Sequence, residues 1–133
     1  MIIYEVNIRI LAEAAEDYAV WLDDHIRQIL EIDGFVSAEW FEVEEDQETR
    51  ELEQAVRQAV RLDESIPAEL REAAAVSVET SLFTVQYRLQ DRYSLERYLM
   101  LHADRMRRDA TERFGDKFAA TRRVMRTRKV FNK

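Results

Sequence analysis

The sequence predicts an α+β domain, because segments with the spacing of strands alternate with segments that have the spacing of helices. Residues 1–11 alternate apolar and polar side chains, which is typical of a strand with one buried face. Within residues 93–118 the apolar side chains recur every three or four positions, which predicts an amphipathic helix. The chain has 133 residues, 47% of them hydrophobic and 35% charged, and is long enough to form one hydrophobic core.

The other elements are predicted from the same two patterns, strand alternation and helical spacing. Apolar side chains have helical spacing from about residue 14 to residue 32, and Gly34 is expected to end that helix. In the later helix, Ser94 is the predicted N-cap and Gly115 the predicted left-handed stop. Strands are predicted at residues 1–11, 35–45, 76–89 and 118–131.

Residues 47–75 differ from the rest of the chain. They predict one helix whose thin apolar stripe includes Leu52 and Val56, and a short second helix opened by Pro67. Neither helix has enough large side chains to form a core of its own. We therefore expect a helical insertion within a single domain that spans residues 1–133.

The resulting order is β-α-β, helical insertion, β-α-β. Two such halves with both helices on one face of an antiparallel sheet make a ferredoxin-like fold, with the strands in the order 4-1-3-2.

Several short motifs also resemble a known family. They are Met1-Ile2-Ile3-Tyr4, Trp21-x-x-x-His25-Ile26, Val85-Gln86-Tyr87, His102-Ala103 with Arg107, and Arg113-Phe114-Gly115-x-x-Phe118 leading to Arg122. Together, over residues 1–46 and 76–126, they resemble the short bacterial proteins grouped as domain of unknown function 4286. The resemblance implies a dimeric α+β barrel, in which two ferredoxin-like units pair their sheets. The family has no established activity, so the resemblance implies no substrate and no catalytic residue.

Composition excludes several classes of protein. Cysteine is absent, which excludes disulfides and most structural zinc sites. With only 2 glycines the chain has no phosphate-binding loop and no dinucleotide fingerprint, so no cofactor is expected. No apolar run approaches the roughly 20 residues of a membrane helix, and the N-terminus lacks the pattern of a signal peptide. A cytoplasmic protein is the expectation.

The two histidines, His25 and His102, both lie on predicted apolar helix faces. At 1.5 Å per residue their heights along the two helices differ by roughly 3 Å, so they are expected near each other. With Tyr18, Trp21 and Tyr98 they are candidates for a ligand pocket, or for the acid/base pair of a small-molecule enzyme such as a cofactor-free monooxygenase. The alternative is that both histidines only fix helix packing. Neither has a partner at a metal-site spacing, so no metal is expected.

Charge is divided unevenly along the chain. Residues 1–91 hold 22 acidic and 7 basic side chains, whereas residues 92–133 hold 5 and 13, and the net charge is −7. The basic last strand could contact phosphates. It lacks the exposed aromatic pair with which such sheets stack on RNA bases, so nucleic-acid binding is a minor alternative.

In the order 4-1-3-2 the edge strands are the second, at residues 35–45, and the last, at residues 118–131. The second is acidic and the last is basic, and they lie far apart in one sheet. A two-fold axis can bring the acidic edge of each copy against the basic edge of the other. The main expectation is therefore a homodimeric binding or structural module without a catalytic motif. The candidate interface residues are Glu39, Glu42, Glu44, Arg122, Arg126, Arg128 and Lys129 on the edges, with Leu52 and Val56 from the insertion.

Overall fold

The computed structural model describes residues 1–75 and 79–133. The chain forms two compact units. The sheet unit consists of Met1–Val43 and Thr80–Lys133, and the helical unit consists of Glu44–Glu79. The predicted insertion at residues 47–75 falls within the helical unit.

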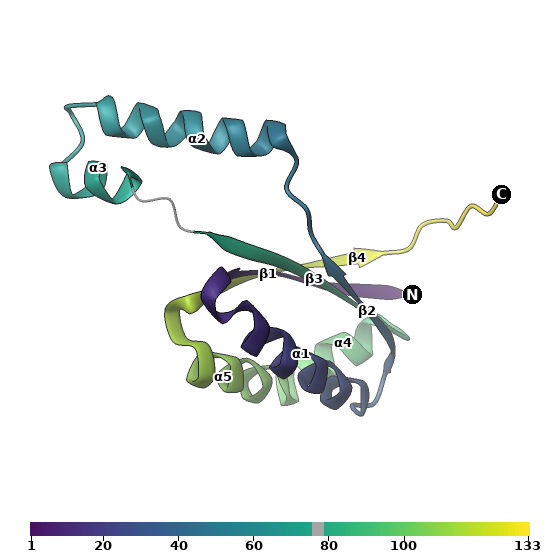
Figure 1. Ribbon diagram of the computed structural model, residues 1–133. Helices are drawn as coiled ribbons and strands as arrows, with labels where there is room; N and C mark the ends of the chain where they lie inside the picture. Colours follow the sequence, from purple (N-terminus) through teal and green to yellow (C-terminus); the bar gives the residue numbers. More distant parts are fainter. Residues whose placement is uncertain (76–78) are drawn as a thin grey trace. The chain divides into compact units, whose positions relative to one another are not determined.

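A four-stranded antiparallel sheet organises the sheet unit (Figure 1). The strand order is β2-β3-β1-β4, so the predicted order 4-1-3-2 is confirmed. The first residues of the predicted third strand, 76–78, lie outside the described part of the chain. The strands are β1 (Ile2–Leu11), β2 (Phe35–Glu42), β3 (Thr80–Leu89) and β4 (Phe118–Arg126).

The last strand ends earlier than the predicted residue 131. Arg126 is paired with Ile2, and the Thr127 amide donates to the Met1 carbonyl oxygen at 3.2 Å. Because the neighbouring strand β1 begins at Ile2, no backbone remains to pair with residues beyond this point.

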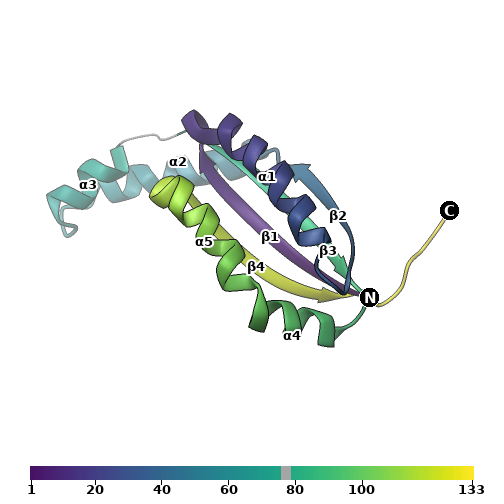
Figure 2. The same cartoon turned by 90° about the horizontal axis from the view of Figure 1, so that it is seen from below.

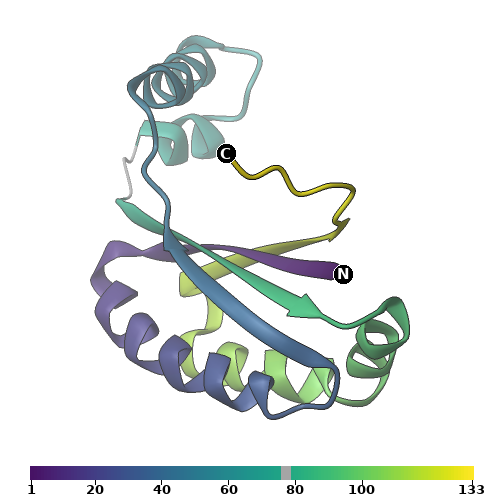
Figure 3. The same cartoon turned by 90° about the vertical axis from the view of Figure 1, so that its right-hand side faces the viewer.

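Three helices cover one face of the sheet (Figures 1 and 3). They are α1 (Ala15–Leu30), α4 (Arg92–Leu101) and α5 (Ala103–Phe114). The α+β fold class is therefore confirmed. The core between helices and sheet contains the buried side chains of Ile2, Tyr4, Ile8, Ile10, Val85, Tyr87 and Leu89 from the strands and Tyr18, Leu22, Ile29, Leu95, Tyr98 and Met106 from the helices.

The helix predicted between Ser94 and Gly115 is broken in two at His102, which corrects the expectation of one continuous helix. His102 has φ −127° and ψ −29°, and α4 and α5 run in different directions on either side of it (Figure 2). Tyr98 and Ala103 are both buried, although five positions apart. On a straight helix they would point about 140° apart, so the break lets both reach the core.

The N-cap of α4 is Asp91 and not the predicted Ser94. The Asp91 Oδ1 atom accepts hydrogen bonds from the Ser94 amide and from the Ser94 hydroxyl, each at 2.8 Å. Ser94 therefore lies in the first turn, where its hydroxyl donates to the capping carboxylate.

Gly34, in the turn between α1 and β2, lies directly against this cap. Its φ of +94° is in the region that favours glycine, and its carbonyl oxygen accepts from the Gln90 amide at 2.9 Å. A β-carbon built on Gly34 would come within 2.4 Å of the Ser94 β-carbon. Gly115, with φ +55°, has no atom within 4 Å of such a β-carbon. Gly34 therefore carries a packing constraint that Gly115 lacks.

We expect Gly34→Ala to lower the free energy of unfolding by about 3 kcal/mol or more, because it combines a left-handed backbone with a clash. Gly115→Ala is the matched control and should cost about 1–3 kcal/mol from the backbone alone, because φ +55° with ψ −126° is rare for residues other than glycine. Chemical denaturation of both variants measures the difference. Adding Ser94→Gly should recover part of the loss in the Gly34 variant. Equal losses in the two alanine variants would contradict the close approach.

Strand β1, one of the two inner strands, also buries a carboxylate on the sheet face away from the three helices. Glu5 is 3% exposed. It accepts hydrogen bonds from Arg123 Nε, from Gln86 Nε2 at 2.9 Å and from Asn7 Nδ2 at 3.1 Å. The bond from Arg123, helped by the two amides, outweighs burial and lowers the pKa of Glu5 to about 2. The carboxylate is therefore charged throughout the neutral range.

The helical unit contains α2 (Gln47–Leu62) and α3 (Ala68–Ala75). Asp46 caps α2 by accepting from the Thr49 amide at 2.7 Å. Leu52 and Val56 are exposed on α2. No helix in the described part of the chain combines the length and hydrophobicity needed to cross a membrane.

Candidate functional site

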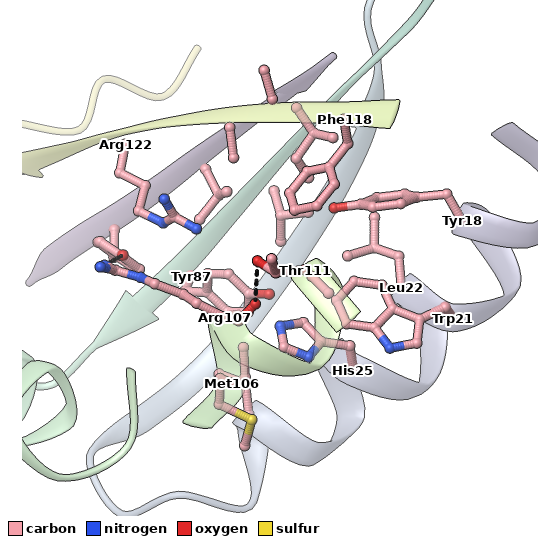
Figure 4. Close-up of a pocket in the computed structure, with 18 of the residues that line it drawn as sticks. Tyr18, Trp21, Leu22, His25, Tyr87, Met106, Arg107, Thr111, Phe118 and Arg122 are labelled. Carbon is pink, nitrogen blue, oxygen red and sulfur yellow. Dashed lines mark hydrogen bonds between the residues drawn. The ribbon is translucent and has the colours of Figure 1, made fainter. Parts of the chain in front are cut away.

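A cavity of about 370 Å³ lies between the sheet and the helices of the sheet unit (Figure 4). Strands β1, β3 and β4 and helices α1, α4 and α5 all contribute to its lining. Ala110 on α5 and Ala120 on β4 both line it, and their short side chains leave space that larger residues would fill.

One wall of the cavity is aromatic. Tyr18 and Trp21 on α1 have ring centroids 5.3 Å apart, and the His25 imidazole stacks on Trp21 at 4.3 Å. Trp21 Nε1 donates to Asp109 Oδ2 at 2.8 Å, which fixes the indole against α5. The cavity therefore presents a flat and held aromatic surface.

His25 turns its imidazole toward the cavity (Figure 4). Burial lowers its pKa to about 4, and the nearby Arg122 charge acts in the same direction. The carboxylates of Asp109 and Asp24 oppose this lowering but do not overcome it. At neutral pH the ring is uncharged, so it can accept a proton or a hydrogen bond.

Two arginines enter the cavity from opposite sides (Figure 4). Arg107 comes from α5, and its Nη2 atom donates to the Tyr4 hydroxyl at 2.9 Å. Arg122 comes from β4, opposite Val6 of β1, whose side chain belongs to the helix-facing row. Together they bring two guanidinium groups to an otherwise largely apolar and aromatic space.

Four of the predicted pocket residues line this cavity, namely His25, Tyr18, Trp21 and Tyr98. His102 does not. It lines a separate hollow, where its Nδ1 atom lies 2.7 Å from Arg105 Nη2. His25 and His102 therefore line different hollows, and His102 lies at the junction between α4 and α5.

Sequence reasoning identified neither Arg107 nor Arg122 as a pocket residue. It named Arg122 only as a candidate for the dimer interface, and that role stays a prediction. The sequence did contain a signal for Arg122. It lies two and four positions after Ala120 and Phe118 in β4, so its side chain shares their face of the sheet, which is the helix side. Arg107 gave no such signal, since it neighbours other arginines along α5 and only the helix break decides which of them faces inward.

The predicted interface residues are distributed over both units. Glu39 and Glu42 lie on edge strand β2, and Arg122 and Arg126 lie on the other edge strand, β4. Arg128 and Lys129 follow the end of β4, and the Lys129 ammonium lies 4.9 Å from the Phe131 ring centroid. Glu44, Leu52 and Val56 belong to the helical unit.

Within residues 1–75 and 79–133, no group of three histidine, aspartate or glutamate side chains is arranged to hold a metal ion.

A family model described as a domain of unknown function, DUF4286, matches residues 1–128. The chain belongs to this family. The resemblance noted in the sequence is thereby confirmed, and the match extends across the helical insertion. A search of curated proteins found no match.

Three solved structures share the fold of this DUF4286 chain. A proposed antibiotic biosynthesis monooxygenase from Deinococcus radiodurans is 14% identical with a TM-score of 0.57, covering 100% of this chain and 98% of that one. SnoaB, a cofactor-independent oxygenase from Streptomyces nogalater, is 11% identical with a TM-score of 0.57, covering 99% and 98%. The de novo designed protein Foldit4 is 11% identical with a TM-score of 0.51, covering 96% and 98%. At these identities the likeness shows the fold alone.

The buried imidazole predicts a pH dependence of stability. The pKa of His25 is about 4 in the folded chain against 6.5 for a free histidine, so only the unfolded chain gains a proton as pH falls from about 6.5 to 4. Over that range the free energy of unfolding should fall by up to about 3 kcal/mol. His25→Phe keeps an aromatic ring beside Trp21 and should lack this loss, whereas His102→Gln should retain it. Denaturant titrations at pH 7, 5.5 and 4.5 measure the effect; parallel curves for wild type and His25→Phe would contradict the burial of the imidazole.

Proposed function

We propose that this protein is a binding module that takes a small organic molecule into the cavity between its helices and sheet. The observation that carries the proposal is the cavity itself, which combines an aromatic wall with a few convergent polar groups. Its volume of about 370 Å³ lies in the range of small-molecule sites.

The lining supports binding in two ways. Trp21 is held by its hydrogen bond to Asp109, so little order need be gained when a flat ligand packs against it. His25, Thr111 and Tyr18 add an imidazole and two hydroxyls to the lining. These groups can orient a ligand through hydrogen bonds while the apolar remainder supplies most of the affinity.

Cofactor-free oxygenation is a second candidate. It is favoured by the fold shared with SnoaB, which is named as a cofactor-independent oxygenase, and by the neutral imidazole of His25 in the cavity. Such a ring can accept the proton of an activated hydroxyl or C–H group. A pKa near 4 makes His25 a weak base, however, and His102 lies elsewhere. Catalysis therefore ranks below binding.

The cavity can be tested with 2-naphthol, a flat and neutral aromatic. Replacing Trp40 with Phe leaves Trp21 as the sole tryptophan and a reporter inside the site. Trp40 Nε1 has no hydrogen-bond partner among the described residues, so this change should cost little stability. We expect a saturable change in Trp21 emission. Ala120→Phe, which fills the cavity, should abolish it, whereas Thr121→Phe on the opposite sheet face should preserve it.

An equal response in the Ala120→Phe variant, or no saturable response at all, would overturn the binding proposal. An oxygen electrode on the same samples separates the second candidate. Consumption of dioxygen that depends on 2-naphthol and disappears in His25→Phe would favour the oxygenase over the simple binding module.

We also propose that two copies pair through the edges of their sheets. Strands β2 and β4 are the two edges, and each offers backbone groups that no strand of the same sheet pairs. The exposed Glu39 on β2 and Arg126 on β4 give these edges opposite charge. Exposed ion pairs contribute little free energy, so the charges set the register while buried area supplies the affinity.

Charge reversal at the edges tests this pairing. Arg126→Glu and Glu39→Arg should each weaken the dimer about tenfold, and the double variant should recover much of the loss because attraction is restored in reversed polarity. Arg92→Glu, an equal charge change on α4, is the control. Sedimentation equilibrium gives the dissociation constants. A monomeric wild type, or a dimer indifferent to both reversals, would contradict edge pairing.

A further inference from the structure

We infer that the molecule held in this cavity is an aromatic carboxylate, with its acidic group between Arg107 and Arg122 and its ring against Trp21. This inference rests on the proposed binding function and specifies the chemical class of the ligand.

The lining of the cavity has charge of one sign. Arg107 and Arg122 are its charged side chains, and none of the described residues that line it is an aspartate or glutamate. Asp109, the carboxylate nearest to Trp21, lies outside the lining and is engaged by Trp21 Nε1 and by Arg113 at 3.8 Å. A ligand that carries negative charge is therefore attracted, and a cationic one is repelled.

Arg107 is half-buried and incompletely satisfied. Its Nη2 atom donates to the neutral Tyr4 hydroxyl, while its Nε atom is buried and has no hydrogen-bond partner among the described residues. A buried donor without a partner is costly, and more so when it belongs to a charged group. A carboxylate supplies both the missing acceptor and the missing charge.

Arg122 lacks a carboxylate partner as well, in contrast to the next residue along β4. Arg123 points to the opposite sheet face and is paired with Glu5. Arg122 forms no ion pair with any described residue, and its charge reaches the surrounding rings, opposing the rise in pKa that burial causes at Tyr18 and Tyr98. The strand thus neutralises one arginine and leaves its neighbour available to a ligand.

The remaining lining selects the body of the ligand. Trp21 and the stacked His25 present flat ring faces, and Val6, Ile8 and Phe118 add apolar surface. A small polyanion such as inorganic phosphate would leave these surfaces unfilled. Two planar guanidiniums beside an aromatic wall fit a planar carboxylate joined to a flat ring.

A matched pair of probes tests the inference by isothermal titration at pH 7. 2-Naphthoate and 2-naphthamide share one ring system and differ in charge. We expect the carboxylate to bind about tenfold more tightly or better. Arg122→Gln and Arg107→Gln should each reduce that preference to about threefold or less. Arg108→Gln, an equal change on α5 outside the cavity, should leave it intact. Thermal melting of each variant confirms that it is folded.

The outcomes distinguish this inference from the proposed function. If both probes bind with equal affinity and Ala120→Phe abolishes both, the anion inference is overturned while cavity binding stands. If neither probe binds, or if both bind Ala120→Phe as well as wild type, the cavity-binding proposal fails and the inference fails with it. A preference for naphthoate that persists in both glutamine variants would place the carboxylate elsewhere and overturn the assignment to these arginines.

Discussion

Strand β1 is paired on both edges, and this constraint determines how the rest of the sheet unit is arranged. Its side chains form two rows, one on each face of the sheet, and each row meets different neighbours. One row, which includes Ile2, Tyr4 and Ile8, is buried beneath the helices, while Glu5 in the other row is charged and held by Arg123. Because successive side chains of a strand point to opposite faces, the pairing of Arg123 with Glu5 directs its neighbour Arg122 toward the helices. The register that brings Arg123 to Glu5 therefore also places the exposed Arg122 on the lining of the cavity.

The cavity itself depends on how the helices pack on the sheet. The break at His102 lets α4 and α5 lie on the sheet at different angles, so that Tyr98 and Ala103 are both buried. Where α5 crosses the sheet, alanines at positions 110 and 120 leave room between the two layers. A ferredoxin-like fold does not by itself require such a cavity, since packed interiors close voids larger than a water molecule. The cavity is thus a property of these residues and not of the topology.

Much of the fold could be predicted from the sequence, because alternation and helical spacing report directly which side of an element is buried. The alternation of Ile2 to Ile10 and the apolar stripe of α1 identified these elements and their buried faces. The strand order followed from the succession β-α-β, β-α-β, which is typical of a ferredoxin-like fold. The helix break escaped prediction, since it occurs at a histidine without proline or glycine nearby and depends on tertiary packing. The candidate site was predictable only in its aromatic part. Arg107 lies on α5 beyond that break, and His102 at the break lines a different hollow from His25.

The central claim is that a cavity charged by two unpaired arginines receives an anionic ligand. A crystal structure of the chain with 2-naphthoate tests it most directly. We expect ligand density between helices and sheet, with carboxylate oxygens within hydrogen-bonding distance of Arg107 and Arg122 and the ring against Trp21. A cavity filled by repacked side chains, or a ligand bound there with its carboxylate directed away from both arginines, would contradict the account.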